Sequence, residues 1–438
     1  MLWGVTDEGL RYAIRQRPAS GVAYCALTIG GGTRAEEELP EGTAHFVEHA
    51  LFKGTKRKSA RVINSYLDRC GGELNAYTTK EEIVLHATVL KEDLHRAADL
   101  LLELAFEATF PEKEIEMERG VIIDEIKSYK DVPSDDIYDR FESMLFEGHP
   151  LSRLILGTVK SVKSIRREHL MAFCARWFRY ENMVLTLTGP QSEAQLKALV
   201  CRLSKRWAGS ASGLSRAGKK FSGPEKRAPE ILFTCASSTP SHGASSPSCP
   251  AATGHLFHQR LNKHNHQCNC VLGVTAPSLG EKERRIGTIL LCNILGGPAT
   301  NSRLNSILRE KYGWVYSVEC SYTPYADTGI VSVTFGCEHE HLDDCLRVVQ
   351  REIRRLREET LTPRAFTRSC RQLLAQLAVS AESGEAQVLS MGKSMSAFGV
   401  VHTPEEDRQA IFSLSPELLR DLAQELFADS RQSLLIYE

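Results

Sequence analysis

Hydrophobic residues recur along the first half of the chain with two spacings, one typical of strands and one typical of helices. Alternating or short apolar runs, bounded by turn-forming residues, predict strands at 10–16, 21–30, 73–78, 83–89 and 183–188. Apolar residues that recur every three or four positions predict helices at 43–53, 60–70, 91–107, 112–130, 134–145, 167–178 and 191–206.

The second half repeats the order of elements of the first half. Strands are predicted at 255–260, 268–275, 315–323, 329–337 and 433–437. Helices are predicted at 280–295, 302–311, 338–358, 363–381, 385–397 and 415–427. Two halves of similar size and order indicate an internal duplication. We therefore predict an α+β fold of two similar, duplicated domains, each a mainly antiparallel sheet packed with helices.

A change in composition separates the two halves. Residues 208–229 are rich in Gly, Ser, Lys and Arg and lack apolar periodicity, which is typical of a linker. We predict a first domain at 1–208, a linker at 209–229 and a second domain at 230–438. Residues 235–254 are biased toward Ser, Pro and Gly, so a poorly ordered loop is expected there, and its composition indicates no function.

Composition argues against several classes of protein. Hydrophobic residues make up 42% and charged residues 25% of the 438 residues, which are ordinary globular values. The net charge of −1 argues against nucleic acid as a partner, and no apolar run reaches the roughly 18 residues of a membrane span. The first residues resemble neither a secretory signal nor an Arg-rich transit peptide. Together with 13 scattered cysteines, interpreted as free thiols, this predicts a cytoplasmic protein.

The clearest chemical signal is the H-x-x-E-H sequence formed by His45, Glu48 and His49. In a helix, these offsets place both imidazoles and the carboxylate on one face, where they can hold a metal ion and activate water. The alternative is a solvated helix face. The neighbouring apolar residues, such as Phe46 and Val47, predict a buried helix, and buried histidines and a buried carboxylate need partners. This favours a metal site.

A third protein ligand is needed for a catalytic zinc site. The predicted helix at 112–130 carries Glu118 and Glu125 seven residues apart, so both project from one face, together with Val121, Ile122 and Tyr129. Two carboxylates on an otherwise apolar stripe favour a functional role. The alternative is that they lie at the edge of the stripe and reach water.

Longer stretches of the chain resemble a known family. GGTRAEEELPEGTAHFVEHALFKGT, followed by ERGVIIDEI about 75 residues later, resembles the pitrilysin/insulinase family of inverzincin zinc peptidases. Within that family, the chain most resembles the branch that contains mitochondrial processing peptidase and its bacterial homologues. The resemblance covers nearly the whole chain, including the GELNAYT segment at 72–78 and, in the second half, 302–304 and 308–317.

The resemblance implies specific roles for the first half of the chain. His45, His49 and Glu125 are implied as ligands of Zn²⁺, and Glu48 as the general base that takes a proton from the attacking water. Glu118 is implied as a carboxylate that orients a ligand histidine. The separation of Glu125 from His49, 76 residues, agrees with the family's spacing.

The resemblance also implies substrate contacts. Arg309 and Tyr316 are implied as binders of the substrate carbonyl or of the developing oxyanion. From the sequence alone, Arg309 would be interpreted as a solvated helix residue and Tyr316 as an aromatic residue on a strand face. Asn75 and Ala76 are implied to lie on an edge strand that pairs with extended substrate.

The implied activity is that of a zinc metallopeptidase, a metalloendopeptidase that hydrolyses oligopeptides or unfolded extended segments in a closed chamber by attack of metal-activated water. Family members of this length pair two chains, so a homodimer or a heterodimer with a related subunit is expected. The alternatives are a presequence-type processing peptidase and a non-catalytic partner subunit. The expected site residues are all present, which argues against a non-catalytic subunit.

A second group of metal-capable residues lies in the second half. His255, His258, His264 and His266 either bind a metal adventitiously or are plain surface histidines, and no acidic or Cys residue lies at a matching helical spacing. The chain lacks a G-x-S-x-G nucleophile elbow, so nucleophilic catalysis has no support.

Overall fold

The computed structural model describes residues 1–218 and 254–438, and within the helix that ends at residue 218 it describes side chains only up to residue 211. The described residues form two compact units. Unit 1 contains residues 1–127, 153–218 and 379–402, and unit 2 contains residues 128–152, 254–378 and 403–438. The predicted loop at 235–254 and the second half of the predicted linker lie outside the described residues, apart from residue 254.

Unit 1 is built on a six-stranded sheet in the order β1-β2-β6-β3-β5-β4. Only β2 and β6 pair in parallel, so the sheet is mainly antiparallel, as predicted. The strands are β1 (Leu2–Val5), β2 (Arg11–Gln16), β3 (Val22–Gly30), β4 (Glu73–Thr78), β5 (Glu82–Leu90) and β6 (Met183–Gly189). Among the described strands, β4 pairs only with β5 and therefore forms one edge of the sheet.

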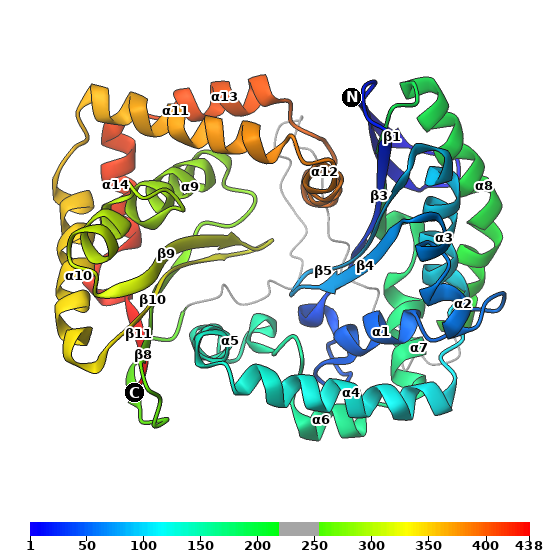
Figure 1. Cartoon of the computed structure of the whole chain (residues 1–438), viewed down its shortest axis with the longest axis horizontal. Coiled ribbons are helices and arrows are strands. Elements are labelled where there is room, and N and C mark those ends of the chain that lie inside the picture. Colours follow the sequence, from blue (N-terminus) through cyan, green and yellow to red (C-terminus); the bar gives the residue numbers. More distant parts are fainter. Residues whose placement is uncertain (219–253) are drawn as a thin grey trace, which may run out of the picture. The chain divides into compact units, whose positions relative to one another are not determined.

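Helices cover both faces of this sheet (Figure 1). One face carries α3 and α8, with α1, α4 and α7 contributing to the same apolar core. The helices from the first half are α1 (Thr43–Leu51), α2 (Ala60–Asn64), α3 (Leu94–Glu107), α4 (Glu112–Lys130), α6 (Val159–Ser164), α7 (Arg167–Trp177) and α8 (Glu193–Gly218). The opposite face carries α12 (Gly384–Phe398), which comes from the second half of the chain.

Unit 2 is built on a five-stranded sheet in the order β7-β11-β8-β10-β9, in which only β7 and β11 pair in parallel. The strands are β7 (His258–Leu261), β8 (Cys268–Ala276), β9 (Val315–Pro324), β10 (Gly329–Cys337) and β11 (Ser433–Tyr437). Its helices are α5 (Pro133–Leu145), α9 (Lys282–Gly296), α10 (Leu342–Glu358), α11 (Pro363–Ser380), α13 (Pro404–Phe412), α14 (Pro416–Leu426) and a π-helical segment at Asn305–Lys311. The prediction of an α+β fold with two mainly antiparallel sheets is confirmed.

The two units exchange one helix each. Helix α5, from the first half of the chain, packs through Phe141 and Leu145 against Val271 and Leu435 of the sheet in unit 2. Helix α12 takes the corresponding place on the sheet of unit 1. A division of the chain at 208 and 230 does not describe this exchange, and those two boundaries stay predictions.

Several predicted elements differ in detail. The helix predicted at 60–70 ends at Asn64 and is followed by a 3₁₀ turn at Asp68–Cys70. The predicted linker at 209–229 begins inside α8, because Trp207 and Ala211, one turn apart, continue the buried face of that helix. Strand β1 and helices α6 and α13 were not predicted. Among the described residues, no helix is long and apolar enough to span a membrane.

Candidate metal centre

Helix α1 presents the H-x-x-E-H residues from a buried backbone. Phe46, Val47 and Leu51 are fully buried in the core of unit 1, which confirms the predicted burial of this helix. Because those apolar residues take the inner side, His45, Glu48 and His49 share the remaining face. The histidine rings lie edge to face with their centroids 4.6 Å apart.

The start of α1 is held by a buried carboxylate. Glu36 accepts hydrogen bonds from the backbone N–H groups of Gly42, at 3.2 Å, and Ala44, at 2.8 Å. The chain turns into the helix at Gly42, whose φ of 86° is a conformation that glycine adopts without strain. Burial raises the pKa of Glu36 to about 8, although Ala44, Arg153 and Gly42 act in the opposite direction. The direction of α1 is therefore fixed from outside the metal group.

Helix α4 brings the third residue to the two histidines. Its buried side, which includes Ile122 and Ile126, packs into the core and turns Glu118 inward. A carboxylate oxygen of Glu125 lies 3.4 Å from Nε2 of His49, and the other lies 3.8 Å from Nε2 of His45. Among the residues that the structure describes, one group of three or more could hold a metal ion, namely His45, His49 and Glu125, whose ligand atoms all lie within 4.8 Å of one another.

The chemistry of this group fits a zinc ion. Two imidazoles and one carboxylate are a ligand set of catalytic zinc sites, and ligand atoms arranged tetrahedrally about 2 Å from one ion lie roughly 3.4 Å apart. Burial, aided by the neighbouring His49, lowers the pKa of His45 to about 3, so its imidazole is neutral and offers a lone pair. Nδ1 of His45 is buried with no hydrogen-bond partner among the described residues.

Glu118 fixes the orientation of His49. Its Oε1 lies 2.8 Å from Nδ1 of His49, which leaves Nε2 of the ring directed at Glu125. Its other oxygen, Oε2, lies 2.6 Å from Nζ of Lys53. Burial acts to raise the pKa of Glu118, but the hydrogen bonds from His49 and Lys53 outweigh it and the pKa is lowered. The family resemblance implied that Glu118 orients a ligand histidine, and this role stays a prediction; the contact with Lys53, four residues after His49 and just beyond the end of α1, was missed.

Glu48 points to a different partner. Its Oε2 accepts a hydrogen bond of 2.7 Å from the hydroxyl of Thr78 at the end of β4. Burial is the main cause that raises the pKa of Glu48, and the hydrogen bond from Thr78 opposes it. Glu48 does not belong to the group of three ligand residues, so its carboxylate is not committed to that group. Sequence reasoning missed Thr78.

The other predicted site residues lie as follows. Asn75 and Ala76 are on the edge strand β4, as expected, with Asn75 exposed. Arg309 lies in the π-helical segment and is half-exposed, and Tyr316 on β9 is 93% exposed. Both belong to unit 2, and their contribution to the site stays a prediction. One expectation was wrong: Val121 is 53% exposed and does not share the buried face with Glu118, because it lies on the solvent side of α4.

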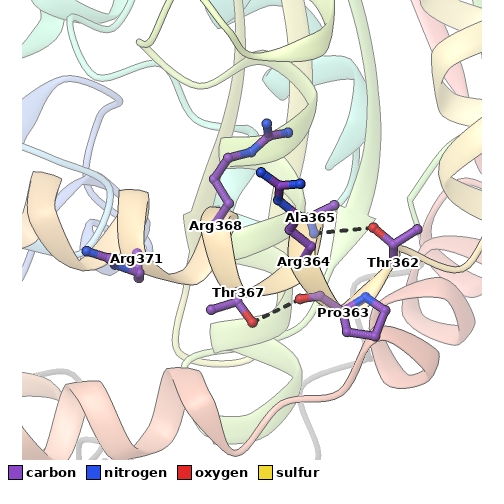
Figure 2. Close-up of a pocket in the computed structure, with 7 residues that line it drawn as sticks. All are labelled: Thr362, Pro363, Arg364, Ala365, Thr367, Arg368 and Arg371. Atoms are coloured by element: carbon purple, nitrogen blue, oxygen red, sulfur yellow. Dashed lines mark hydrogen bonds between the residues drawn. The ribbon is translucent and has the colours of Figure 1, made fainter.

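The remaining candidates form no second metal group in the part of the chain that the structure describes. His255, His258, His264 and His266 are all exposed. The eleven described cysteines are free thiols, and Sγ of Cys268 lies 3.2 Å from Nδ1 of His339 without a third ligand. A hollow of about 880 Å³ along α11 (Figure 2) is lined by residues that include Arg364, Arg368 and Arg371, none of them a metal ligand.

Comparisons with known proteins identify the family to which the chain is similar. Residues 11–159 match the insulinase family, peptidase family M16, and residues 164–373 match the family described as the peptidase M16 inactive domain. An uncharacterized zinc protease of Bacillus subtilis is 29% identical, with 98% of this chain and 96% of the relative covered. An uncharacterized zinc protease of Rickettsia bellii is 30% identical, with 92% of this chain and 90% of the relative covered.

Solved structures share the fold along the whole chain. A peptidase M16 inactive domain from Pseudomonas fluorescens superposes with a TM-score of 0.81 at 19% identity, covering 100% of this chain and 97% of the other. A protease from Helicobacter pylori superposes with a TM-score of 0.81 at 17% identity, covering 100% and 99%. With two family matches and full-length relatives, the chain belongs to the peptidase M16 (insulinase/pitrilysin) family.

Proposed function

We propose that this protein is a zinc-dependent endopeptidase that hydrolyses oligopeptides and unfolded, extended segments. The observation that carries the proposal is the convergence of His45, His49 and Glu125 beside a carboxylate, Glu48, that is not one of the ligands. The relatives' description as zinc proteases supports the same activity.

The residues divide the work of peptide hydrolysis among themselves. His45, His49 and Glu125 would hold Zn²⁺, which supplies Lewis acidity that makes water more acidic and polarises a carbonyl group. Glu48 accepts the proton of the attacking water and then donates it to the leaving amine. Glu118 keeps His49 in the tautomer and ring orientation that direct Nε2 toward the ligand group.

The substrate would bind as a strand. The free edge of β4 offers backbone groups to an extended peptide, with Asn75 and Ala76 beside the scissile region. Arg309 and Tyr316 would donate to the carbonyl oxygen on which negative charge develops. An enclosed chamber, pairing with a second chain and a cytoplasmic location remain proposals that rest on the family resemblance and the sequence.

The test is hydrolysis of a mixed pool of unstructured peptides of about 10–30 residues by the full chain and by Glu48→Gln, with the zinc content of both measured. We expect the wild type to cut, and the variant to keep its zinc and not cut. Zinc in both proteins without cleavage by either indicates a missing partner chain or a non-catalytic subunit. Loss of zinc from the wild type contradicts the ligand assignment.

A further inference from the structure

The contact between Thr78 and Glu48 joins the edge strand of unit 1 to the helix that carries the proposed base. We propose that Thr78 is a positioning residue for Glu48, holding its Oε2 so that Oε1 is the atom that exchanges the proton. The proposal rests on the proposed function, because Glu48 matters as a base only if the protein hydrolyses peptides.

The position of Thr78 is set by the sheet and not by its contact with Glu48. Leu74 and Ala76, four and two residues earlier, pack against the core that also contains the apolar residues of α1. Because side chains alternate along a strand, Thr78 points to that same face. Its backbone pairs with Ile83 on β5 at the end of the strand. The sheet therefore determines where the Thr78 side chain lies, independently of its hydrogen bond to Glu48.

The next threonine in the chain, Thr79, makes its hydrogen bonds within the turn between β4 and β5. Thr79 Oγ1 accepts hydrogen bonds from the backbone N–H groups of Glu81 and Glu82, at 3.2 and 3.1 Å, and so stabilises the turn between β4 and β5. Of these two neighbours, Thr78 alone has its hydroxyl on Glu48.

The hydrogen bond has a chemical consequence for the carboxylate. An ionised carboxylate is an acceptor only, and a hydroxyl at 2.7 Å that donates to Oε2 takes one of the two lone pairs of that oxygen and makes it less basic than Oε1. A proton taken up by Glu48 then goes to Oε1, which this hydrogen bond leaves available. A glutamate side chain also loses conformational entropy when it is fixed in one rotamer for reaction. Because the hydrogen bond from Thr78 already fixes Glu48 in the free protein, this entropy is lost before the substrate binds.

The same strand serves two purposes in this view. Thr78 lies two residues beyond Ala76 on the strand whose free edge is proposed to pair with the substrate. The base is thereby held by the element along which the peptide lies. Any shift of β4 toward or away from a bound peptide moves the hydroxyl that orients Glu48.

The test compares Thr78→Val, which keeps the shape and removes the donor, with Thr78→Ser, which keeps the donor. Zinc content, kcat and KM are measured for peptide hydrolysis. We expect Thr78→Val to hold zinc as the wild type does. Its kcat should fall about ten-fold with little change in KM, because the free energy of one hydrogen bond to a charged group corresponds to a rate factor of at least about ten. Thr78→Ser should recover most of the loss. Thr88→Val, a half-buried threonine on β5 opposite Glu73, is the matched control and should stay at the wild-type rate.

A crystal structure of each variant supplies a readout that does not depend on hydrolysis. We expect Glu48 in one orientation in the wild type and in Thr78→Ser, and in several orientations in Thr78→Val. An unchanged, ordered Glu48 in Thr78→Val, or a Thr78→Ser variant as slow as Thr78→Val, overturns the proposal for Thr78. A wild type that holds zinc and hydrolyses no peptide bears on the proposed function instead, since it indicates a missing partner chain or a non-catalytic subunit, and the Glu48 orientations still decide the role of Thr78.

Discussion

Three polar side chains around the candidate centre, those of His49, Glu118 and Glu48, are each restrained by a partner from a different element. Glu118 on α4 holds His49 on α1, Lys53 holds Glu118, and Thr78 on β4 holds Glu48. Such partners fix the orientation and tautomer of a histidine ring before the metal binds, and they restrict the rotamers of a carboxylate side chain. The reactive groups are therefore preorganised by contacts that sequence spacing does not describe.

Replacing Glu118 tests this arrangement at the level of one residue. Glu118→Gln removes the charge that accepts from both His49 and Lys53, so we expect zinc affinity to fall about 10- to 100-fold. Competition with a fluorescent chelator measures it. Asp124→Asn, which removes an equal charge from a side chain 76% exposed on the same helix, should bind zinc as the wild type does. Equal losses in the two variants would mean that net charge alone controls the affinity.

Glu82 gives a pH dependence that is separate from the metal group. Burial raises the pKa of this carboxyl on β5. The positive charge of Lys393 lowers the pKa, but this effect is smaller. When pH rises above about 4.5, the unfolded chain loses the proton first, so the folded state holds more protons and is destabilised relative to the unfolded state. The free energy of unfolding should therefore fall, by at most ~1.4 kcal/mol per pH unit, until the folded pKa is passed.

The variant Glu82→Gln cannot ionise and should lack this fall. Urea unfolding between pH 4.5 and 7.5 measures the difference between the variant and the wild type. Glu73→Gln, at an exposed position on the neighbouring strand β4, is the control and should follow the wild-type curve. Parallel curves for Glu82→Gln and the wild type would show that Glu82 is ionised in both states over this range.

The residues of the site differ in how far sequence reasoning can place them. His45, Glu48 and His49 share a helix, so their spacing alone fixes their relative positions. Glu125 is 76 residues from His49; the helical pattern at 112–130 offered both Glu118 and Glu125 as candidates, and the family resemblance implied Glu125 as the ligand. Thr78 and Lys53 were not predicted, because their hydrogen bonds depend on how β4 and α4 lie against α1, which periodicity does not specify.

At the scale of elements, helix α12 lies very close to the sheet of unit 1 at two of its glycines. A Cβ at Gly392 would meet Oγ1 of Thr28 well inside van der Waals contact, and one at Gly384 would meet the ring of Tyr24. Thr186 also donates a hydrogen bond of 3.0 Å to the carbonyl of Val388 in the same helix. Glycine in this helix therefore sets the distance between α12 and the sheet.

Gly392→Ala tests that close approach. An alanine in an unhindered helix interior would stabilise the protein by up to about 1 kcal/mol relative to glycine. Here we expect a loss of about 1–3 kcal/mol in the free energy of unfolding, because the added methyl group would clash with the buried side chain of Thr28. Ser390→Ala, on the exposed side of α12, should change stability little. A more stable Gly392→Ala would show that the helix can shift outward without cost.

The elements that sequence reasoning missed have weak signals for identifiable reasons. Helix α13 buries only Ile411 and has a polar first turn, so it lacks an apolar stripe, although Thr403 and Glu406 form a capping box at its start. Helix α6 has six residues and buries only Val162. The long strands and helices with continuous buried faces, such as β5 and α4, were placed within one or two residues.

At the scale of the molecule, apolar patterning predicts that a face is buried and leaves open what covers it. The apolar faces of α5 and α12 were recognised as helical, yet each packs on the sheet of the other half of the chain. Sequence order alone suggests two contiguous domains. Which sheet α5 and α12 cover depends on three-dimensional packing, which sequence order does not specify. Each unit therefore contains a covalent segment of the opposite half.

This division also predicts where metal removal acts. All three proposed ligands lie in unit 1, and a ligand that binds only the folded state stabilises it by about 2.7 kcal/mol at a concentration about 100 times Kd. Hydrogen exchange with and without a chelator should therefore show faster exchange in α1 and α4, while β8 and β10 of unit 2 keep their protection. His49→Gln, which lacks one proposed ligand, should respond little to the chelator. Equal loss of protection in both units would mean that they unfold as one cooperative body, in which case zinc stabilises the whole chain through the exchanged helices.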